Sequence, residues 1–459
     1  MPTLIRTGRA SVIIGALVLA AAGCSRDSLL AVQTPDQILP GSAQTPAGAQ
    51  ALWAAAIGNF NNFFGGTTLL GANIYGGLLS DELNNARPGG AHIDQRAFNP
   101  NTFPNNAWDN FSQAYTQLIR GRDHLVGYAA AGASRSTQTG QLYALSGLTL
   151  TIGAELFCNG VPLSDVNDVK PSWTVVTNAQ MYQRAGAQFD SALTTLSSSA
   201  SDLPLRYLAR VGKARALVDL GQYAQAAAVV RANGDGVGSP AVPTSFVYNA
   251  EYAQGTLTND IYDWMVATAN FAPANKEGGN GLDFFSAQDP RVVMSTTTRT
   301  GQDGVTPVHT VLGYPNGNAP IRLATGVEAR MIEAEAALQA NDPAGYLGAL
   351  DAARSDAGAR GAWGITSTSP DPLPPLADPG TPNARIDLLF RERGFWFYLT
   401  AHRVGDLRRL VRQYGRDPNT VWPTGAYLAG GTYGTDQNIT PSIAENNNPG
   451  WHGCADRNP

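Results

Sequence analysis

Apolar residues recur at three- and four-residue steps through much of this chain, the period of a helix with one buried face. The pattern predicts helices beginning near Thr45, a short element at Tyr75–Leu79, and places Trp108 and Trp396 in the core. The longer predicted helices cover residues 51–64, 106–125, 137–158, 182–196, 205–220, 327–338 and 344–354. The chain is therefore expected to be mostly α-helical.

One turn between predicted helices carries a repeat signature. In Leu220–Ala226, Gly221 permits a tight turn, and Tyr223 and Ala226 occupy large and small packing positions, as in a tetratricopeptide hairpin. A second pair of this kind is expected at 327–338 and 344–354. About a hundred residues separate the two pairs, so the array of helical hairpins is predicted to be interrupted.

The interruption is a loop-rich insert at residues 231–320. It is rich in Gly, Pro, Asn and aromatic residues, and short strands are expected at 292–298 and 306–312. A second Pro-rich run covers 366–382, and the residues after 414 are expected to be loop. Since binding residues concentrate on loops held by a rigid scaffold, the insert is the expected location of a ligand site.

Charged and aromatic residues are concentrated at Arg385–Tyr414, whose apolar positions predict one helix that Gly394 could interrupt. Asp387 and Arg391 are spaced to pair on that helix, and we predict a structural ion pair between Arg403 and Asp406. An anion-binding site is the alternative, which the nearby acids disfavour because they can pair with the arginines. Replacing Asp406 with Ala is expected to lower thermal stability.

The N-terminus has the pattern of an export signal. Arg6 and Arg9 precede an apolar run at 11–22 that is too short to span a membrane. The tetrapeptide ending at Cys24 resembles a bacterial lipobox, which predicts a signal peptide at 1–23, lipidation at Cys24 and a tether at 24–44. The alternative is an ordinary secretory signal with an unrelated Cys. The body from residue 45 onward is expected to be one soluble unit.

The net charge and the cysteine content limit which binding partners and cross-links are expected. Removal of residues 1–23 takes away two arginines and no acid, which moves the net charge from −5 to −7. Such a protein is not expected to bind nucleic acid. With Cys24 modified, Cys158 and Cys454 remain, and in an oxidising compartment they form a disulfide or stay as two separate thiols.

No catalytic motif stands out. The five histidines are scattered, and we find no metal-ligand spacing, phosphate loop or nucleophile motif, so no cofactor, metal or enzymatic activity is expected. Asp81 and Glu82 form the most notable acidic pair. A capping or salt-bridge role is favoured over catalysis, although carboxylates of a glycoside hydrolase could meet from any part of the chain.

Several segments together resemble the SusD/RagB family of outer-membrane nutrient-binding lipoproteins. They are the lipobox at Cys24, Leu79–Glu82, the helix 108–120, Gly160–Leu163, Asp289–Arg291, the 391–410 block and Asn447–Trp451. Phe397 and Thr400 stand where the family commonly has acids. The resemblance implies about four tetratricopeptide-like hairpins supporting a loop-rich half, and a lipid-anchored surface protein that passes a glycan or other nutrient to a SusC-like TonB-dependent transporter.

Aromatic faces suit sugar rings, and amide and guanidinium groups suit hydroxyls and carboxylates. These chemistries select six ligand-binding candidates: Asn84, Asn85, Arg87, Arg96, Trp264 and Tyr314. Nutrient binding is the favoured function. The alternatives are a helical-repeat scaffold that assembles envelope proteins and, less favoured, an envelope glycoside hydrolase.

Overall fold

The computed structural model describes residues 40–66, 70–89, 93–97, 106–165, 172–366 and 370–454. The predicted signal peptide, the lipidation site at Cys24 and the tether as far as residue 39 lie outside them. Contacts divide the chain after Ala43, and the unit from Gln44 onward is the one discussed below. Within the described part of the chain, no helix is both long and apolar enough to cross a membrane.

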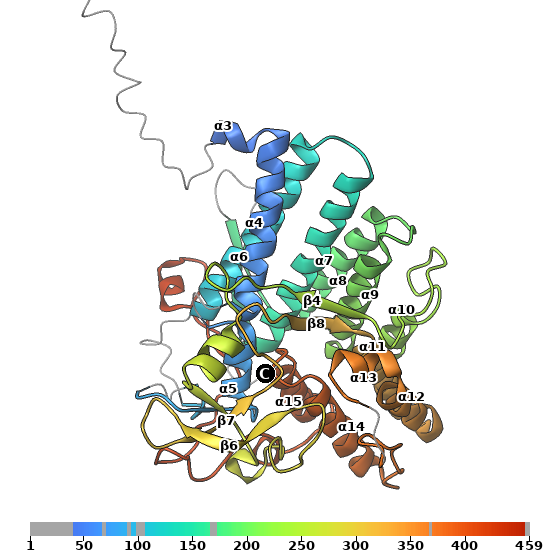
Figure 1. The fold of residues 1–459 in the computed structure, drawn as a ribbon. Helices are drawn as coiled ribbons and strands as arrows, with labels where there is room; N and C mark the ends of the chain where they lie inside the picture. Colours follow the sequence, from blue (N-terminus) through green and yellow to red (C-terminus); the bar gives the residue numbers. More distant parts are fainter. Residues whose placement is uncertain are drawn as a thin grey trace, which may run out of the picture. The chain divides into compact units, whose positions relative to one another are not determined.

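Helices dominate this unit, as the hydrophobic periodicity predicts. In chain order the α-helices are α4 (Pro46–Gly65), α5 (Ala72–Leu79), α6 (Asn106–Tyr128), α7 (Ala133–Leu156), α8 (Asn178–Thr195), α9 (Leu203–Asp219), α10 (Tyr223–Val230), α11 (Gly326–Gln339), α12 (Pro343–Ser355), α13 (Ala357–Ala362), α14 (Pro382–Trp396), α15 (Arg403–Arg412) and α16 (Pro418–Val421). Thr45 caps α4 by accepting the Gly48 N–H at 3.0 Å. In Figure 1, helices α4, α6, α7, α8 and α9 follow one another across the molecule.

Helices that are neighbours in the chain pack as hairpins, in the pairs α6/α7, α8/α9, α9/α10 and α11/α12. Gly221, with a φ of 73°, makes the turn between α9 and α10 that the repeat signature predicts. Phe189 of α8 packs where α7 and α9 each present a glycine: a Cβ on Gly147 or Gly212 would lie 2.7 or 2.5 Å from its ring. These small residues allow the hairpins to pack closely.

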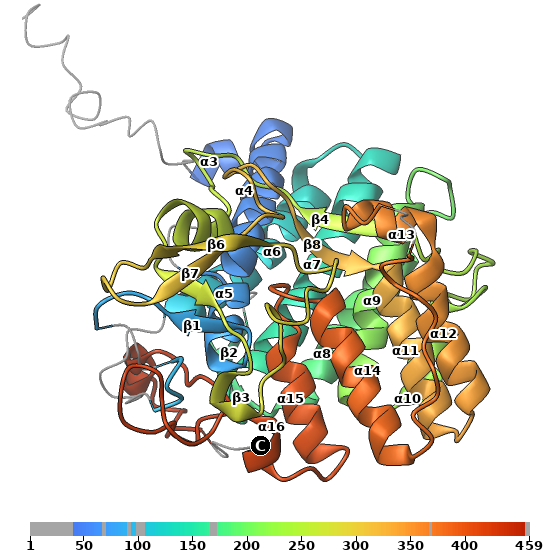
Figure 2. The same ribbon diagram turned by 60° about the horizontal axis from the view of Figure 1, so that its bottom comes forward.

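The loop-rich lobe, residues 231–320, contains short strands and two irregular helical turns. The strands of the unit are β1 (Leu83–Asn85), β2 (Val161–Asp165), β3 (Ser172–Val176), β4 (Val247–Ala250), β5 (Phe271–Pro273), β6 (Met294–Thr300), β7 (Pro307–Val311) and β8 (Ile321–Thr325); the turns are η1 (Ile261–Ala267) and η2 (Glu277–Gly279). The strands pair antiparallel as β1–β5, β2–β3, β4–β8 and β6–β7. The β6–β7 hairpin confirms the two strands expected in the insert. Figure 2 shows it on one side of the view and α10, α11 and α12 on the other.

The segment Arg385–Tyr414 is two helices, and the expected interruption at Gly394 is wrong. Gly394 lies inside α14, where a Cβ would meet Leu282 at 2.4 Å, so its small size serves packing. The break comes at 397–402, where Leu399 and Ala401 have φ values of 57° and 58°. Non-glycine residues rarely adopt this conformation unless their surroundings hold it. The Leu399 N–H donates to Glu82 Oε1 at 3.1 Å, and the Ala401 carbonyl accepts from Arg215 at 2.7 Å.

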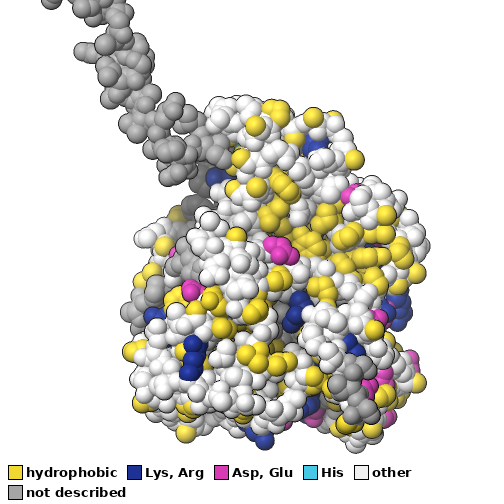
Figure 3. Space-filling view, viewed as in Figure 1, with side chains coloured by type: hydrophobic (Ala, Val, Ile, Leu, Met, Phe, Trp, Pro, Cys, Tyr) yellow, Lys and Arg dark blue, Asp and Glu magenta, His cyan; other side chains and the backbone are white. Residues whose placement is uncertain are grey.

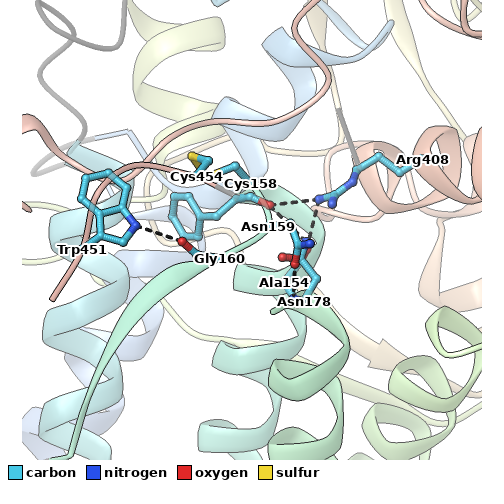
Figure 4. The surroundings of a disulfide bond; sticks show 9 residues. Ala154, Cys158, Asn159, Gly160, Asn178, Arg408, Trp451 and Cys454 are labelled. Carbon is cyan, nitrogen blue, oxygen red and sulfur yellow. Dashed lines mark hydrogen bonds between the residues drawn. A yellow bond between two sulfur atoms is a disulfide. The ribbon is translucent and has the colours of Figure 1, made fainter. Parts of the chain in front are cut away.

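Cys158 and Cys454 form a disulfide with Cα atoms 5.9 Å apart, the first of the two alternatives that the sequence left open. Hydrogen bonds near the disulfide also hold the C-terminal segment against the end of α7 and the start of β2 (Figure 4). The Trp451 indole donates to the Gly160 carbonyl at 2.9 Å. Arg408 of α15 donates to the carbonyls of Ala154 and Phe157 at 3.0 and 3.1 Å, which caps the end of α7. The chain end is thus tied to the middle of the helical array.

Candidate functional site

The charges of the Arg385–Tyr414 segment form structural ion pairs, but not between the predicted partners. Arg403 pairs with Asp81 at 2.6 Å, and Asp406 pairs with Arg393 and Arg409 at 2.9 and 2.8 Å. The predicted pair between Arg403 and Asp406 is therefore wrong. At three residues' separation the two side chains could meet on one helix, but Asp81 and Arg393 offer bidentate partners across the break between α14 and α15.

The pairing of Asp387 with Arg391 that helical spacing predicts is also replaced by contacts across the fold. Arg391 binds Asp283 of the loop-rich lobe at 2.6 Å, and Asp387 binds Arg416 at 2.8 Å. His402 lies 3.2 Å from Glu328 of α11. The charged segment thus joins several elements to one another, which supports the structural interpretation over an anion-binding site.

Asp81 and Glu82 hold the break between α14 and α15 in place. Asp81 is fully buried against Arg403, and Glu82, 1% exposed, accepts the Leu399 N–H. Burial raises the pKa of Glu82 to about 8. A buried carboxyl with a raised pKa resembles a general acid. Both Asp81 and Glu82, however, contact core segments, and Asp81 forms the salt bridge that the sequence favours over a catalytic role.

The next residues of the chain carry the sequence-predicted ligand candidates. In β1, Asn84 and Asn85 lie opposite Ala272 and Phe271 of β5. The Asn85 side chain donates to the carbonyl of Arg87 at 2.8 Å, which fixes the backbone where the strand ends. Because β5 belongs to the loop-rich lobe, this pairing brings the candidates Asn84 and Asn85 against that lobe.

Arg87 and Trp264 meet at this place. The guanidinium carbon of Arg87 lies 5.6 Å from the centroid of the Trp264 ring, within the range of a cation–π contact. Trp264 projects from η1 and lies 6.0 Å, centroid to centroid, from Phe271 of β5. Both Arg87 and Trp264 are half-buried, so each keeps some surface open to solvent. We define Asn84, Arg87 and Trp264 as the β1–η1 face.

Arg96 and Tyr314 do not join the β1–η1 face. Arg96, 3% exposed, donates to the carbonyls of Asp436 and Pro423 at 2.8 and 2.6 Å and lies over the Trp422 ring. Burial lowers its pKa to about 10. Tyr314 is 5% exposed within the hydrophobic core. Their burial argues against direct ligand contact, and Arg96 instead anchors the C-terminal loops.

A group of polar residues that the sequence did not reveal lies behind Asn84. Asp94 and Glu277 are buried together, and the hydroxyls of Tyr427 and Tyr433 donate to them at 2.7 and 2.9 Å. Burial raises the pKa of both carboxyls. The charge of Asp94 and the hydrogen bond between the two acids raise the pKa of Glu277 further, whereas the same hydrogen bond opposes the rise in the pKa of Asp94. These four residues come from three distant stretches of chain, and no local pattern marks them.

Cavities of similar size border the helices. One of about 380 Å³ is bordered by Asp342, Arg385 and Tyr414, another of about 370 Å³ by Arg391, Leu407 and Arg416, and a third of about 380 Å³ by residues 221–225 and Ala340. Their charged lining residues already have ion-pair or hydrogen-bond partners. Within the described ranges, no group of three or more His, Cys, Asp or Glu side chains is arranged to hold a metal ion.

The face shown in Figure 3 carries few charged side chains, which are scattered among neutral and hydrophobic ones. In the loop-rich lobe, Val293, Val305 and Leu312 are exposed by 48, 80 and 51%. This character suits a neutral ligand with apolar surfaces better than a polyanion.

Several solved structures share this fold, although no family model and no curated protein matches the sequence. It is similar to surface glycan-binding protein A from Bacteroides uniformis, with a TM-score of 0.63, 14% identity and coverage of 90% of this chain and 100% of that one. A putative sugar binding protein from Bacteroides vulgatus matches with a TM-score of 0.61, 14% identity and coverage of 90% and 99%. A SusD homolog from Bacteroides thetaiotaomicron matches with a TM-score of 0.59 and 12% identity, and the match covers 92% of this chain and 93% of that one.

This chain has a SusD-like fold. The resemblance to the SusD/RagB family is therefore confirmed at the level of the fold. The predicted fold class, mostly helical with tetratricopeptide-like hairpins, is confirmed as well. In this SusD-like chain the helical hairpins support the loop-rich lobe, and the β1–η1 face lies at its edge.

Proposed function

We propose that this SusD-like protein binds a glycan at the cell surface and delivers it to a SusC-like TonB-dependent outer-membrane transporter. The observation that carries the proposal is the match of the fold along nearly the whole chain to a surface glycan-binding protein. Under this proposal residues 1–23 are a signal peptide, Cys24 carries the lipid, residues 24–44 form a tether, and residues 45–459 are one binding body without catalytic activity, cofactor or metal-dependent chemistry.

The β1–η1 face supports glycan binding chemically. The Trp264 ring offers an apolar surface on which the C–H face of a sugar ring can stack. Arg87 and Asn84 supply donors for hydroxyl or carboxylate oxygens at the same place. A half-buried aromatic residue with polar neighbours is the usual composition of a carbohydrate contact.

The test is a panel of neutral and acidic polysaccharides in affinity electrophoresis, with the mature form beginning at Ser25. Retardation by at least one polysaccharide, without release of reducing sugar, is expected. Reducing-sugar release would favour the glycoside hydrolase alternative. Transfer is tested separately by mild solubilisation of outer membranes that contain the lipidated protein. Co-purification of a large β-barrel is expected, and its repeated absence together with other bound envelope proteins would favour the scaffold alternative.

A further inference from the structure

A second group of aromatic and amide side chains lies on the helical array, where α4, α7 and β4 meet. The indole N–H of Trp53 in α4 donates to Gln141 Oε1 in α7 at 3.2 Å. The amide nitrogen of Gln141 donates in turn to the hydroxyl of Tyr248 in β4 at 2.8 Å. One glutamine therefore holds the two aromatic side chains in a fixed relation to each other.

A pair of amides lies one helical turn away on the same two helices. Gln50 and Gln138 exchange two hydrogen bonds, at 3.0 and 2.7 Å. Gln50 precedes Trp53 by three residues and Gln138 precedes Gln141 by three, so the two levels lie about 4.5 Å apart at the helical rise of 1.5 Å per residue. Among the described residues, each of the three glutamine amides uses one N–H in these contacts. The second N–H of each amide remains available to an oxygen of a ligand.

The two aromatic side chains are open on one side. Trp53 and Tyr248 are partly buried: they pack against the hydrophobic core, and the rest of each side chain is in contact with solvent. Figure 3 shows hydrophobic side chains gathered beside α4 and around β4. The Tyr248 hydroxyl accepts from Gln141 and keeps its own proton for donation. An aromatic surface beside neutral amides and a hydroxyl suits the apolar face and the hydroxyl groups of a sugar ring.

The charge at this place favours a neutral ligand. Glu251, the exposed residue that follows β4, is close enough for its charge to act on the Tyr248 hydroxyl. A carboxylate on the ligand would be repelled by this acid. We define the Trp53 site as the five uncharged side chains that meet here: Gln50, Trp53, Gln138, Gln141 and Tyr248.

Helix α4 connects the Trp53 site to the β1–η1 face. Trp53 and Gly65, the last residue of α4, are twelve positions apart, or about 18 Å along the helix. Gly66, the next residue, forms a β-bridge with Asn259, just before η1, and η1 carries Trp264. The two aromatic groups therefore lie toward opposite ends of one stretch of helix, a separation that a glycan of several sugar units can span.

We propose that the Trp53 site binds a ring of a neutral glycan, as a second subsite in addition to the β1–η1 face. This inference rests on the proposed function, because it assumes that the protein binds a glycan. A polymer held at one subsite reaches the other at a high effective concentration, so two weak contacts together retain it more firmly than either does alone.

Affinity electrophoresis with laminarin, xylan and galactomannan as neutral probes and polygalacturonate as the acidic probe tests the subsite. At least one neutral polymer is expected to retard the wild type. Trp53→Ala is expected to weaken binding of that polymer by about 2- to 10-fold, the effect of losing one aromatic contact. In a Trp264→Ala background, the same substitution is expected to reduce the remaining retardation further.

A second variant keeps both rings. Gln50→Ala combined with Gln138→Ala removes the amide pair near the surface and is expected to weaken binding as well, so it remains informative if Trp53→Ala fails to fold. Gln225→Ala, at an exposed glutamine of α10, is the matched control and is expected to bind as the wild type does. Circular dichroism establishes that each variant is folded.

The outcomes separate the subsite from the proposed function. Unaltered retardation of the folded Trp53 and glutamine variants by a polymer that retards the wild type would overturn the second subsite and leave the proposed function standing. If none of the polysaccharides retards the wild type, both the subsite and the proposed glycan binding are overturned. Stronger retention of polygalacturonate than of every neutral polymer at the Trp53 site, measured in the Trp264→Ala protein, would overturn the assignment to a neutral glycan.

Discussion

Arg403 donates two hydrogen bonds to Asp81, a residue 322 positions earlier in the chain: Nε to Oδ1 at 2.6 Å and Nη2 to Oδ2 at 2.7 Å. The Asp81 side chain is fully buried and that of Arg403 is 6% exposed. The contact joins the segment before β1 to the start of α15. It therefore couples the base of the loop-rich half to the last helices of the array.

Removal of one partner should show how much this pair stabilises the fold. Asp81→Asn leaves the buried Arg403 guanidinium without a countercharge, and we expect a loss of about 3–5 kcal/mol in the free energy of unfolding. Asp387→Asn, whose carboxylate is 66% exposed and pairs with Arg416, is the matched control, with an expected loss below about 1 kcal/mol. Denaturant unfolding measures both. Equal losses in the two variants would contradict a special role for the buried pair.

Replacement of Asp406 tests the second buried cluster. Its carboxylate accepts from Arg393 at 2.9 and 3.0 Å and from Arg409 at 2.8 Å, and the two guanidinium groups outweigh burial, so that the pKa of Asp406 is held well below its ordinary value. Asp406→Ala leaves two buried arginines short of a partner. We expect a loss of about 3–5 kcal/mol in unfolding free energy, measured by denaturant titration at neutral pH. An unchanged midpoint would contradict the structural role of Asp406.

The helices and most of their limits could be predicted from the sequence because each depends on local periodicity and turn chemistry, as at Gly221. The ion pairs could not. Spacing along one helix correctly places Arg403 and Asp406 on adjacent turns, but their partners Asp81 and Arg393 compete from across the fold. The break at Leu399 has the same origin: Glu82 and Arg215 hold a backbone conformation that the local sequence would not select.

Only some residues of the candidate site could be predicted from the sequence. Residue chemistry identified Arg87 and Trp264, which the structure brings together, because an aromatic residue and a cation in loop-rich sequence are recognisable. Burial excluded Arg96 and Tyr314 from the β1–η1 face, and burial of a loop residue depends on tertiary contacts. Asp94 and Glu277 gave no sequence signal because neither lies in a motif.

The raised pKa of the buried Glu82 carboxyl predicts that the folded protein loses stability as the pH rises. Burial raises its pKa in the folded protein to about 8, above its ordinary value near 4.5. The folded state therefore binds its proton more tightly than the unfolded state does, and the stabilisation is complete below about pH 4.5 and is lost as pH rises to about 8, by at most ~1.4 kcal/mol per pH unit. Glu82→Gln should flatten the unfolding free energy over this window relative to the wild type. An identical pH slope in the two proteins would show that Glu82 does not titrate there.

The disulfide between Cys158 and Cys454 should stabilise the fold chiefly through the unfolded state, since it closes a loop of 296 residues. We expect Cys454→Ser to lower the free energy of unfolding by about 2–5 kcal/mol. In the wild type, a reducing agent should give the same loss, and it should have no further effect on the variant. Release of the segment 443–454 to a protease in the variant, while Trp451 stays protected in the oxidised wild type, checks that the bond holds the chain end.

The β1–η1 face makes the sharpest prediction about ligand binding. Trp264→Ala removes the half-buried ring over which Arg87 lies, and a lost stacking surface of this kind should weaken binding of the retained polysaccharide by about 10- to 100-fold, or ~1.4–2.8 kcal/mol. Arg87→Gln keeps a donor but removes the charge, and its effect should be larger for an acidic glycan than for a neutral one. Val305→Ala, at a side chain that is 80% exposed in the same lobe, is the control and should bind normally. Circular dichroism and Tm establish that each variant is folded, and unaltered affinity in folded Trp264→Ala and Arg87→Gln proteins would place the glycan site elsewhere on the molecule.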